Sequence, residues 1–73
     1  LKGALNDYNQ AIKLDATEPD YWLNRGLIKE QLKDVTGALS DYSQVIRLKP
    51  DYEKAWLNHG NALVKQNKLT EAI

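Results

Sequence analysis

The sequence contains no cysteine, and it has only two prolines. Without cysteine the chain cannot form a disulfide, present a thiolate nucleophile or bind zinc through sulfur. No apolar run approaches the roughly 18 residues that suggest a membrane-spanning helix, and no charged-then-apolar start resembles a signal peptide. These absences favour a soluble protein in a reducing compartment, and we predict a cytoplasmic location.

An excess of either charge is also lacking. Ten Lys and Arg residues balance ten Asp and Glu residues, so the formal net charge is zero. A domain that binds DNA, RNA or an anionic membrane normally carries a clear excess of basic residues. We therefore expect no nucleic-acid and no membrane partner.

The sequence holds few of the residues that catalysis requires. His59 is the single histidine, and no serine has a predictable base beside it. A metal site on a helix would need a second ligand at a spacing such as i+4 from His59, but that position is Leu63. The four glycines do not cluster into a phosphate-binding loop. We predict that the chain is not an enzyme and has no metal and no cofactor.

What the sequence does contain is a repeat of 34 residues. The segment 3–14 reads GALNDYNQAIKL and returns at 37–48 as GALSDYSQVIRL, and WLNRG at 22–26 returns as WLNHG at 56–60. Residues 1–39 laid over residues 35–73 give 14 identities in 39 positions. A period of this length is typical of proteins built from stacked structural units.

Apolar residues recur every three or four positions in each copy, which predicts helices rather than strands. Pro19 suits the first turn of a helix, with Thr17 or Glu18 as its cap, and Asp34 suits the cap of the next one. The predicted helices are 3–14, about 20–33, 35–48 and one that starts at about 51 or 52 and ends at 66, followed by a turn at 67–68 and the start of a fifth helix at 69–73. Antiparallel helix pairs that cannot bury their own apolar faces stack on copies of themselves, so the sequence predicts an all-α solenoid.

The residues that recur resemble the signature of the tetratricopeptide repeat (TPR) family. Trp22 with Gly26 and Trp56 with Gly60 match the first helix of such a repeat, and the second helix is matched by Ala38, Tyr42, Val45 and Pro50. The resemblance implies an alpha-alpha superhelix of helix pairs in a single domain, 1–73. In it, 1–18 is the second helix of one repeat, 19–52 is a complete repeat, and 53–73 is the first helix and the start of the second helix of the next. We therefore expect the chain to be a piece of a longer array.

The resemblance also predicts how the helices pack. Gly26 and Gly60 should let the helices of a unit approach closely, with Ala4, Ala38 and Ala72 as small partners. Trp22, Trp56, Tyr8 and Tyr42 should fill the volume between units.

Some residues depart from the family pattern or lie on unpaired helix faces. Arg25, Lys29 and His59 stand where the family prefers apolar or aromatic residues, and we expect their polar ends to reach solvent. Since about three repeats are needed for independent stability, we expect exposed apolar faces at both ends, for example at Leu5, Ile12 and Ala72.

In this family the first helix of each repeat lines a concave groove that binds peptides or partner proteins. By register, the groove residues here are Asp20, Leu23, Asn24, Leu27 and Gln31 from one helix and Lys54, Leu57, Asn58, Asn61 and Lys65 from the next. Asn24 and Asn58 occupy equivalent positions, so their amides should hold a peptide backbone unless they are simply solvated. Lys54 and Lys65 should attract a carboxylate.

The function that follows is a non-enzymatic protein–protein interaction module or scaffold that binds a peptide or partner protein. Asn24 and Lys54 also match the carboxylate clamp of chaperone-binding members, but Asn58 stands where that clamp has arginine, so we do not expect a chaperone tail. The alternative is a structural module that forms homo-oligomers through its exposed terminal helix faces.

Overall fold

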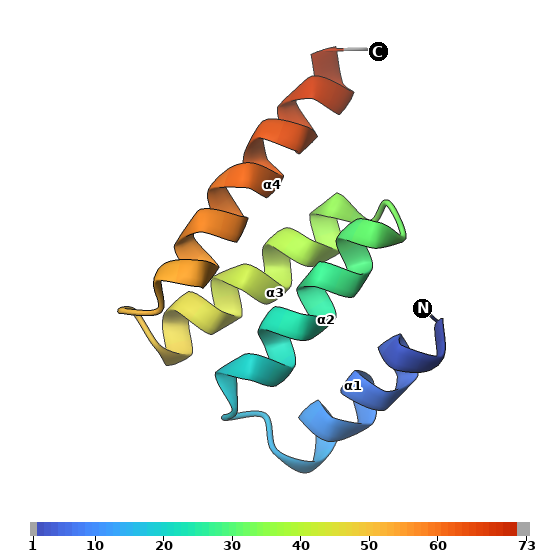
Figure 1. The fold of residues 1–73 in the computed structure, drawn as a ribbon, viewed down its shortest axis with the longest axis vertical. Helices are drawn as coiled ribbons and strands as arrows, with labels where there is room; N and C mark the ends of the chain where they lie inside the picture. The colour runs from blue at the N-terminus through green and yellow to red at the C-terminus, as the bar shows by residue number, and fades with distance from the viewer. Residues whose placement is uncertain (1, 72–73) are drawn as a thin grey trace.

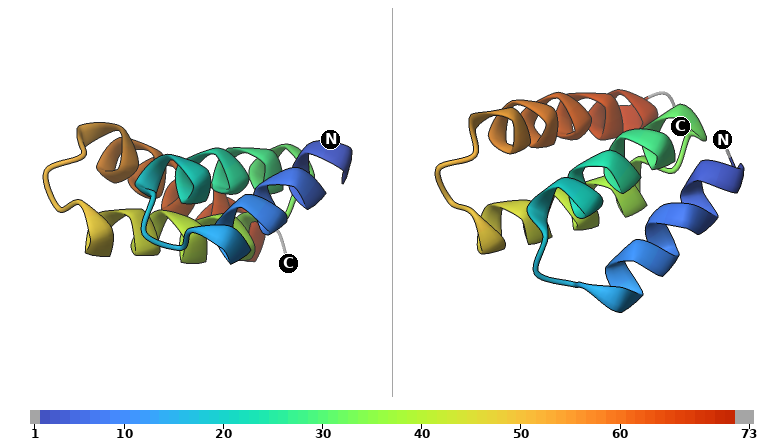
Figure 2. Two further views of the ribbon diagram at one scale, coloured as in Figure 1. Left: turned by 90° about the horizontal axis from the view of Figure 1, so that it is seen from below. Right: turned by 60° about the horizontal axis from the view of Figure 1, so that its bottom comes forward.

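The computed structural model describes residues 2–71, which form four α-helices and no strand (Figure 1). The helices are α1 (Lys2–Leu14), α2 (Pro19–Gln31), α3 (Val35–Leu48) and α4 (Glu53–Glu71). Consecutive helices run antiparallel and pack side by side, α1 on α2, α2 on α3 and α3 on α4 (Figures 1 and 2). The predicted all-α helical-repeat fold is confirmed.

Two predicted helix starts are confirmed by their capping interactions. The Glu18 side chain accepts a hydrogen bond from the backbone N–H of Asp20, and Pro19 occupies the first turn of α2. Asp34 Oδ1 accepts from the Gly37 N–H at 3.0 Å. Both side chains satisfy backbone donors that lack a partner within the helix, which defines where each helix begins.

The predicted end of α4 is wrong. The sequence predicts a turn at Asn67 and Lys68 and a new helix from Leu69, but α4 continues without interruption to Glu71. The remainder of that predicted fifth helix, 72–73, lies outside the described residues.

The reason for the difference lies in the residues one period earlier. There the chain turns through Lys33, which adopts a left-handed conformation with φ of 71°, and Asp34 then caps α3. The residue equivalent to Asp34 is Lys68, whose ammonium group has no lone pair to accept a hydrogen bond from a helix N-terminus. Without a cap to begin a new helix, the chain keeps the hydrogen bonds of α4.

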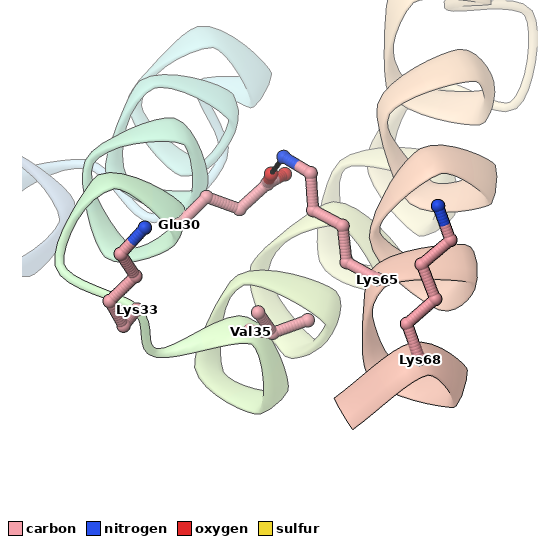
Figure 3. Close-up of a pocket in the computed structure, with 5 residues that line it drawn as sticks. All are labelled: Glu30, Lys33, Val35, Lys65 and Lys68. Carbon is pink, nitrogen blue, oxygen red and sulfur yellow. Dashed lines mark hydrogen bonds and ion pairs between the residues drawn. The ribbon is translucent and has the colours of Figure 1, made fainter. Parts of the chain in front are cut away.

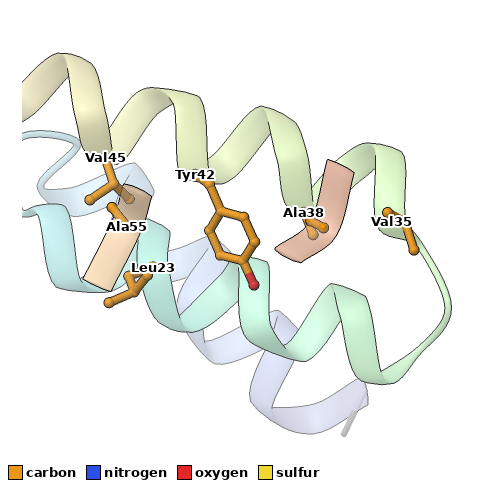
Figure 4. Close-up of a cluster of buried hydrophobic side chains, with 7 residues drawn as sticks. Leu23, Val35, Ala38, Tyr42, Val45 and Ala55 are labelled. Atoms are coloured by element: carbon orange, nitrogen blue, oxygen red, sulfur yellow. The ribbon is translucent and has the colours of Figure 1, made fainter. Parts of the chain in front are cut away.

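The hydrophobic core is centred on α3. Ala38, Tyr42 and Val45 are fully buried, and they pack with Leu23 of α2 and Ala55 of α4 (Figure 4). Because α3 contacts a helix on either side, its apolar stripe is covered on both flanks. The core therefore joins three helices and fixes the distance between α2 and α4.

The outer helices are covered to different extents. The prediction that Ile12 faces solvent is wrong. Ile12 is buried, because α1 packs on α2. Leu5 is half-buried, and Ala72 lies outside the described residues.

The two tryptophans of the repeat are also covered to different extents. Trp22 is half-buried beside the core, whereas Trp56 is 53% exposed. The second tryptophan thus does not fill an interhelical space as predicted.

The two repeated glycines also differ in their surroundings. A Cβ atom added to Gly26 would lie 2.6 Å from Cε1 of Tyr42, which is fully buried. At Gly60 the added atom would meet nothing within 4 Å. The close approach predicted from the glycine pattern exists at Gly26, where the neighbour is the Tyr42 ring, and it is absent at Gly60 among the described residues.

This difference predicts opposite effects for the same substitution. Gly26→Ala gains up to about 1 kcal/mol of helix propensity, but overpacking against the Tyr42 ring costs about 1–3 kcal/mol. We expect a net loss of stability. Gly60→Ala meets no neighbour, so we expect it to stabilise the protein by about 0.5–1 kcal/mol. Urea unfolding of both variants, followed by circular dichroism, checks the prediction, and equal shifts in the same direction would contradict it.

Candidate functional site

A cleft of about 540 Å³ lies between α2 and the first half of α4. Both helices present the same register positions to it, because α3 holds them in parallel one period apart. The cleft is lined by Asp20, Leu23, Asn24, Leu27, Tyr52, Lys54, Leu57 and Asn58.

Most of the predicted groove residues meet in this cleft. Those that the structure brings together are Asp20, Leu23, Asn24, Leu27, Lys54, Leu57 and Asn58. Gln31, Asn61 and Lys65 do not line it. They lie further along α2 and α4, outside the cleft.

Asn24 and Asn58 supply side-chain amides to the cleft that can hydrogen-bond to a ligand. Both side chains are half-buried, and neither forms a hydrogen bond with another residue in the described part of the chain. Each amide carries two donors and an acceptor, which is the combination needed to pair with a peptide group. Leu23 lies buried at the base, while Leu27 and Leu57 are exposed at 38% and 65% and offer apolar contact.

Tyr52 is a cleft residue that the sequence did not reveal. Its hydroxyl donates a 2.6 Å hydrogen bond to Asp20 Oδ1, and this bond raises the pKa of Tyr52. The bond joins the segment before α4 to the first turn of α2. The residue one period before Tyr52 is Glu18, so the repeat pattern does not indicate that a tyrosine at this position lines the cleft.

Lys65 is engaged elsewhere. The sequence predicts that it attracts an acidic ligand, but its Nζ lies 2.7 Å from Glu30 Oε2. Figure 3 draws this ion pair as a dashed line. Together with Lys33, Val35 and Lys68, this pair lines a second cavity of about 310 Å³. Among the described residues of the 540 Å³ cleft, Lys54 is therefore the cation left without an ionic partner.

A buried ion-pair network holds α2 in place. Asp41 of α3 is 1% exposed, and Arg25 donates to it from Nε at 2.9 Å and from Nη2 at 2.7 Å. Lys29 Nζ approaches the same carboxylate at 3.3 Å, and Arg25 Nη1 donates to Asn9 of α1 at 3.0 Å. The guanidinium also lies 4.8 Å from the centre of the Trp22 ring. Arg25 thus connects three helices.

The prediction that Arg25 and Lys29 extend into solvent is wrong, because a buried carboxylate requires partners. Sequence reasoning missed Asp41, although a signal was available. Asp41 stands three residues after Ala38 and four before Val45, inside the apolar stripe of α3. An acidic residue at such a position indicates a basic partner on the facing helix.

His59 occupies the position equivalent to Arg25. It makes a weaker version of the contact between Arg25 and Asn9. Its Nε2 lies 3.5 Å from Ser43 Oγ, and Ser43 is the counterpart of Asn9. In the described part of the chain, no three His, Cys, Asp or Glu side chains gather in a way that could hold a metal ion. His59 is thus part of the helix packing.

Comparison with known proteins agrees with this architecture. Residues 1–33 and 30–67 each match the family described as TPR repeat. Among curated proteins, a search finds no match to the chain. No helix among residues 2–71 is long and apolar enough to cross a membrane. With two tandem matches across 1–67 and a fold of antiparallel helix pairs, the chain belongs to the tetratricopeptide repeat family, whose repeats in general mediate interactions between proteins.

Proposed function

We propose that the chain is a non-enzymatic interaction module that binds an extended peptide segment of a partner protein in the cleft between α2 and α4. The observation that carries the proposal is the pair of unpartnered, half-buried amides of Asn24 and Asn58 at equivalent positions on the two helices. Leaving such amides without partners is unfavourable unless water or a ligand satisfies them.

An extended peptide suits the cleft for a physical reason. Its backbone offers N–H and C=O groups at regular spacing, and two amides in register can pair with them whatever the peptide sequence. Leu27 and Leu57 favour an apolar side chain on the peptide, and the free ammonium of Lys54 favours an acidic side chain or a terminal carboxylate. The preferred ligand is therefore an extended segment with one acidic group beside an apolar residue.

The test begins with a library of random peptides displayed on phage, selected against the protein. The affinity of an enriched peptide is then measured by fluorescence anisotropy for the protein and for the double variant Asn24→Ala, Asn58→Ala. At about 0.5–1.5 kcal/mol for each lost hydrogen bond, we expect the dissociation constant to rise by about tenfold or more.

The chain offers a matched control for this experiment. Gln31→Ala with Asn61→Ala removes two exposed amides from the same two helices outside the cleft. We expect the control to bind the peptide as tightly as the unmodified protein, and both double variants to keep its melting temperature. Equal affinities for the two double variants would reject the proposed role of Asn24 and Asn58.

A further inference from the structure

The second cavity, of about 310 Å³, carries an excess of positive charge. Its lining contains the lysines Lys33, Lys65 and Lys68, against the acidic residue Glu30. Figure 3 shows Glu30 and Lys33 on one side, Lys65 and Lys68 of α4 on the other, and Val35 of α3 between them. Val35 is 8% exposed. A cavity that combines cations with an apolar contact suits an acidic side chain, whose methylene groups are apolar and whose carboxylate is charged.

The carboxylate of Glu30 is already engaged by groups of the protein. Its Oε1 accepts a hydrogen bond from the Tyr42 hydroxyl, and its Oε2 accepts one from Lys65 Nζ at 2.7 Å. The Glu30 side chain is only 12% exposed, whereas the Lys65 side chain is 58% exposed. Since an ammonium group has three donors, Lys65 keeps donors for a ligand. Lys33 and Lys68 are exposed and form no ion pair in the described part of the chain.

Lys33 occupies a backbone position that favours glycine. Its φ is 71°, and it directly follows the C-cap of α2. The Lys33 N–H donates to Glu30 O at 2.9 Å, and the Asp34 N–H donates to Lys29 O at 2.8 Å, which are the hydrogen bonds that close a helix through a left-handed residue. A side chain in this conformation costs free energy that glycine avoids. Lysine is therefore unfavourable for the fold here, which indicates a role for its charge beside the cavity.

The cavity lies on the same pair of helices as the cleft. The cleft is beside Asn24 and Asn58, and the cavity is beside Glu30 and Lys65. Lys65 follows Asn58 by seven positions, so the two residues lie on one face of α4 and are separated by about 10 Å along its axis. An extended peptide covers this distance with about three residues. A single peptide can therefore reach both sites.

We propose that the cavity binds acidic side chains of a partner protein's peptide, about three residues from the peptide group that Asn24 and Asn58 hold. The position of these side chains within the peptide rests on the proposed function of the cleft. Their carboxylates pair with Lys33, Lys68 and the remaining donors of Lys65. Because Lys54 lies on the other side of Asn58, the ligand carries acidic groups on both sides of the backbone segment in the cleft.

A nuclear magnetic resonance titration with a blocked tri-aspartate peptide tests the cavity directly, and blocked tri-asparagine is the uncharged comparison. We expect the amide resonances of Lys33, Val35 and Lys65 to shift with tri-aspartate and to stay in place with tri-asparagine. Shifts that are no larger for tri-aspartate would overturn the proposal. Inorganic phosphate that gives the same shifts at the same concentration would also overturn it, because the cavity would then bind small anions rather than a peptide.

A double variant with a matched charge control identifies the lysines that bind the probe. Lys33→Gly with Lys68→Gln removes two charges from the cavity, and Lys2→Gln with Lys13→Gln removes two exposed charges from α1. We expect the dissociation constant of tri-aspartate to rise about three- to tenfold for the cavity variant and by less than about twofold for the control. Unchanged affinity in the cavity variant would contradict the proposal.

Lys33→Gly alone separates binding from folding. We expect it to raise the melting temperature by about 2–6 °C, because glycine relieves the left-handed backbone, and to weaken binding of tri-aspartate. Lys33→Arg keeps the charge and should bind like the unmodified protein. If Lys33→Gly raises the melting temperature without weakening binding, the side chain of Lys33 has no part in the site.

A lengthened peptide tests the link between the cavity and the cleft. The peptide enriched by phage selection is extended with Gly-Gly-Asp-Asp at one end or the other, with Gly-Gly-Asn-Asn as the control. One acidic extension should lower the dissociation constant about three- to tenfold, and the cavity variant should lose this gain. If neither extension improves binding, the two sites do not share a ligand.

Failure of the cleft proposal can be distinguished from failure of this one. Tri-aspartate should bind the double variant Asn24→Ala, Asn58→Ala as tightly as it binds the unmodified protein, because the cavity does not include these amides. A loss of tri-aspartate binding in this variant would place the probe in the cleft and overturn the assignment of the cavity.

Discussion

Replacing Arg25 with leucine is expected to lower the free energy of unfolding by about 3–5 kcal/mol, the cost of leaving one partner of a buried ion pair uncompensated. Asp41 is 1% exposed and would keep only Lys29, at 3.3 Å, as a charged partner. A chain of 73 residues has a total stability of roughly 4–11 kcal/mol. Urea titrations followed at 222 nm should therefore show a midpoint at a clearly lower urea concentration, with partial unfolding even without urea if the total stability lies near the lower bound.

Two further variants separate the charge effect from a general effect of leucine. Arg47→Leu removes an exposed arginine from α3 and should change stability by less than about 0.5 kcal/mol. The double variant Arg25→Leu, Asp41→Leu removes both partners, and we expect it to recover much of the loss because no buried charge remains. If Arg25→Leu is no more damaging than Arg47→Leu, the network does not stabilise the fold.

Tyr42→Ala is expected to destabilise the protein as much as Arg25→Leu, by about 3–5 kcal/mol. It removes the largest fully buried side chain among the described residues and leaves a cavity in the core. The substitution also removes the hydroxyl that donates to Glu30 Oε1. Burial, with the Glu30 carboxylate beside it, raises the pKa of Tyr42 well above its ordinary value, so the hydroxyl stays protonated and remains a donor. Thermal unfolding and urea titration measure the loss.

The repeat provides the comparison for this variant. Tyr8→Ala changes the equivalent residue of α1, which is half-buried, and should cost clearly less. Tyr42→Phe keeps the ring and removes only the hydroxyl, with an expected loss of about 0.5–1.5 kcal/mol. Equal losses for Tyr8→Ala and Tyr42→Ala would show that burial is not the cause.

The candidate cleft could be predicted in part. Asn24, Asn58 and the leucines around them were located because the period places equivalent residues side by side on parallel helices. Lys65 was assigned to the same surface, but a side chain of this length reaches Glu30 on the neighbouring helix instead. Tyr52 was missed because its contact joins the two ends of one repeat, 19–52, and the residue one period before it is Glu18, so the pattern holds no counterpart of the contact with Asp20.

The sequence alone determined the helices apart from the end of α4, their antiparallel order and the family, because periodicity and capping residues act over a few positions and recur every 34 residues. Only the tertiary structure decided which of two identical residues is buried. Gly26 lies under Tyr42, while Gly60 faces open space, and Asp41 is enclosed by cations, while Asp7 is exposed. The physical reason is that burial depends on whether a neighbouring helix is present, and that differs between the middle and the ends of a stack of otherwise similar repeats.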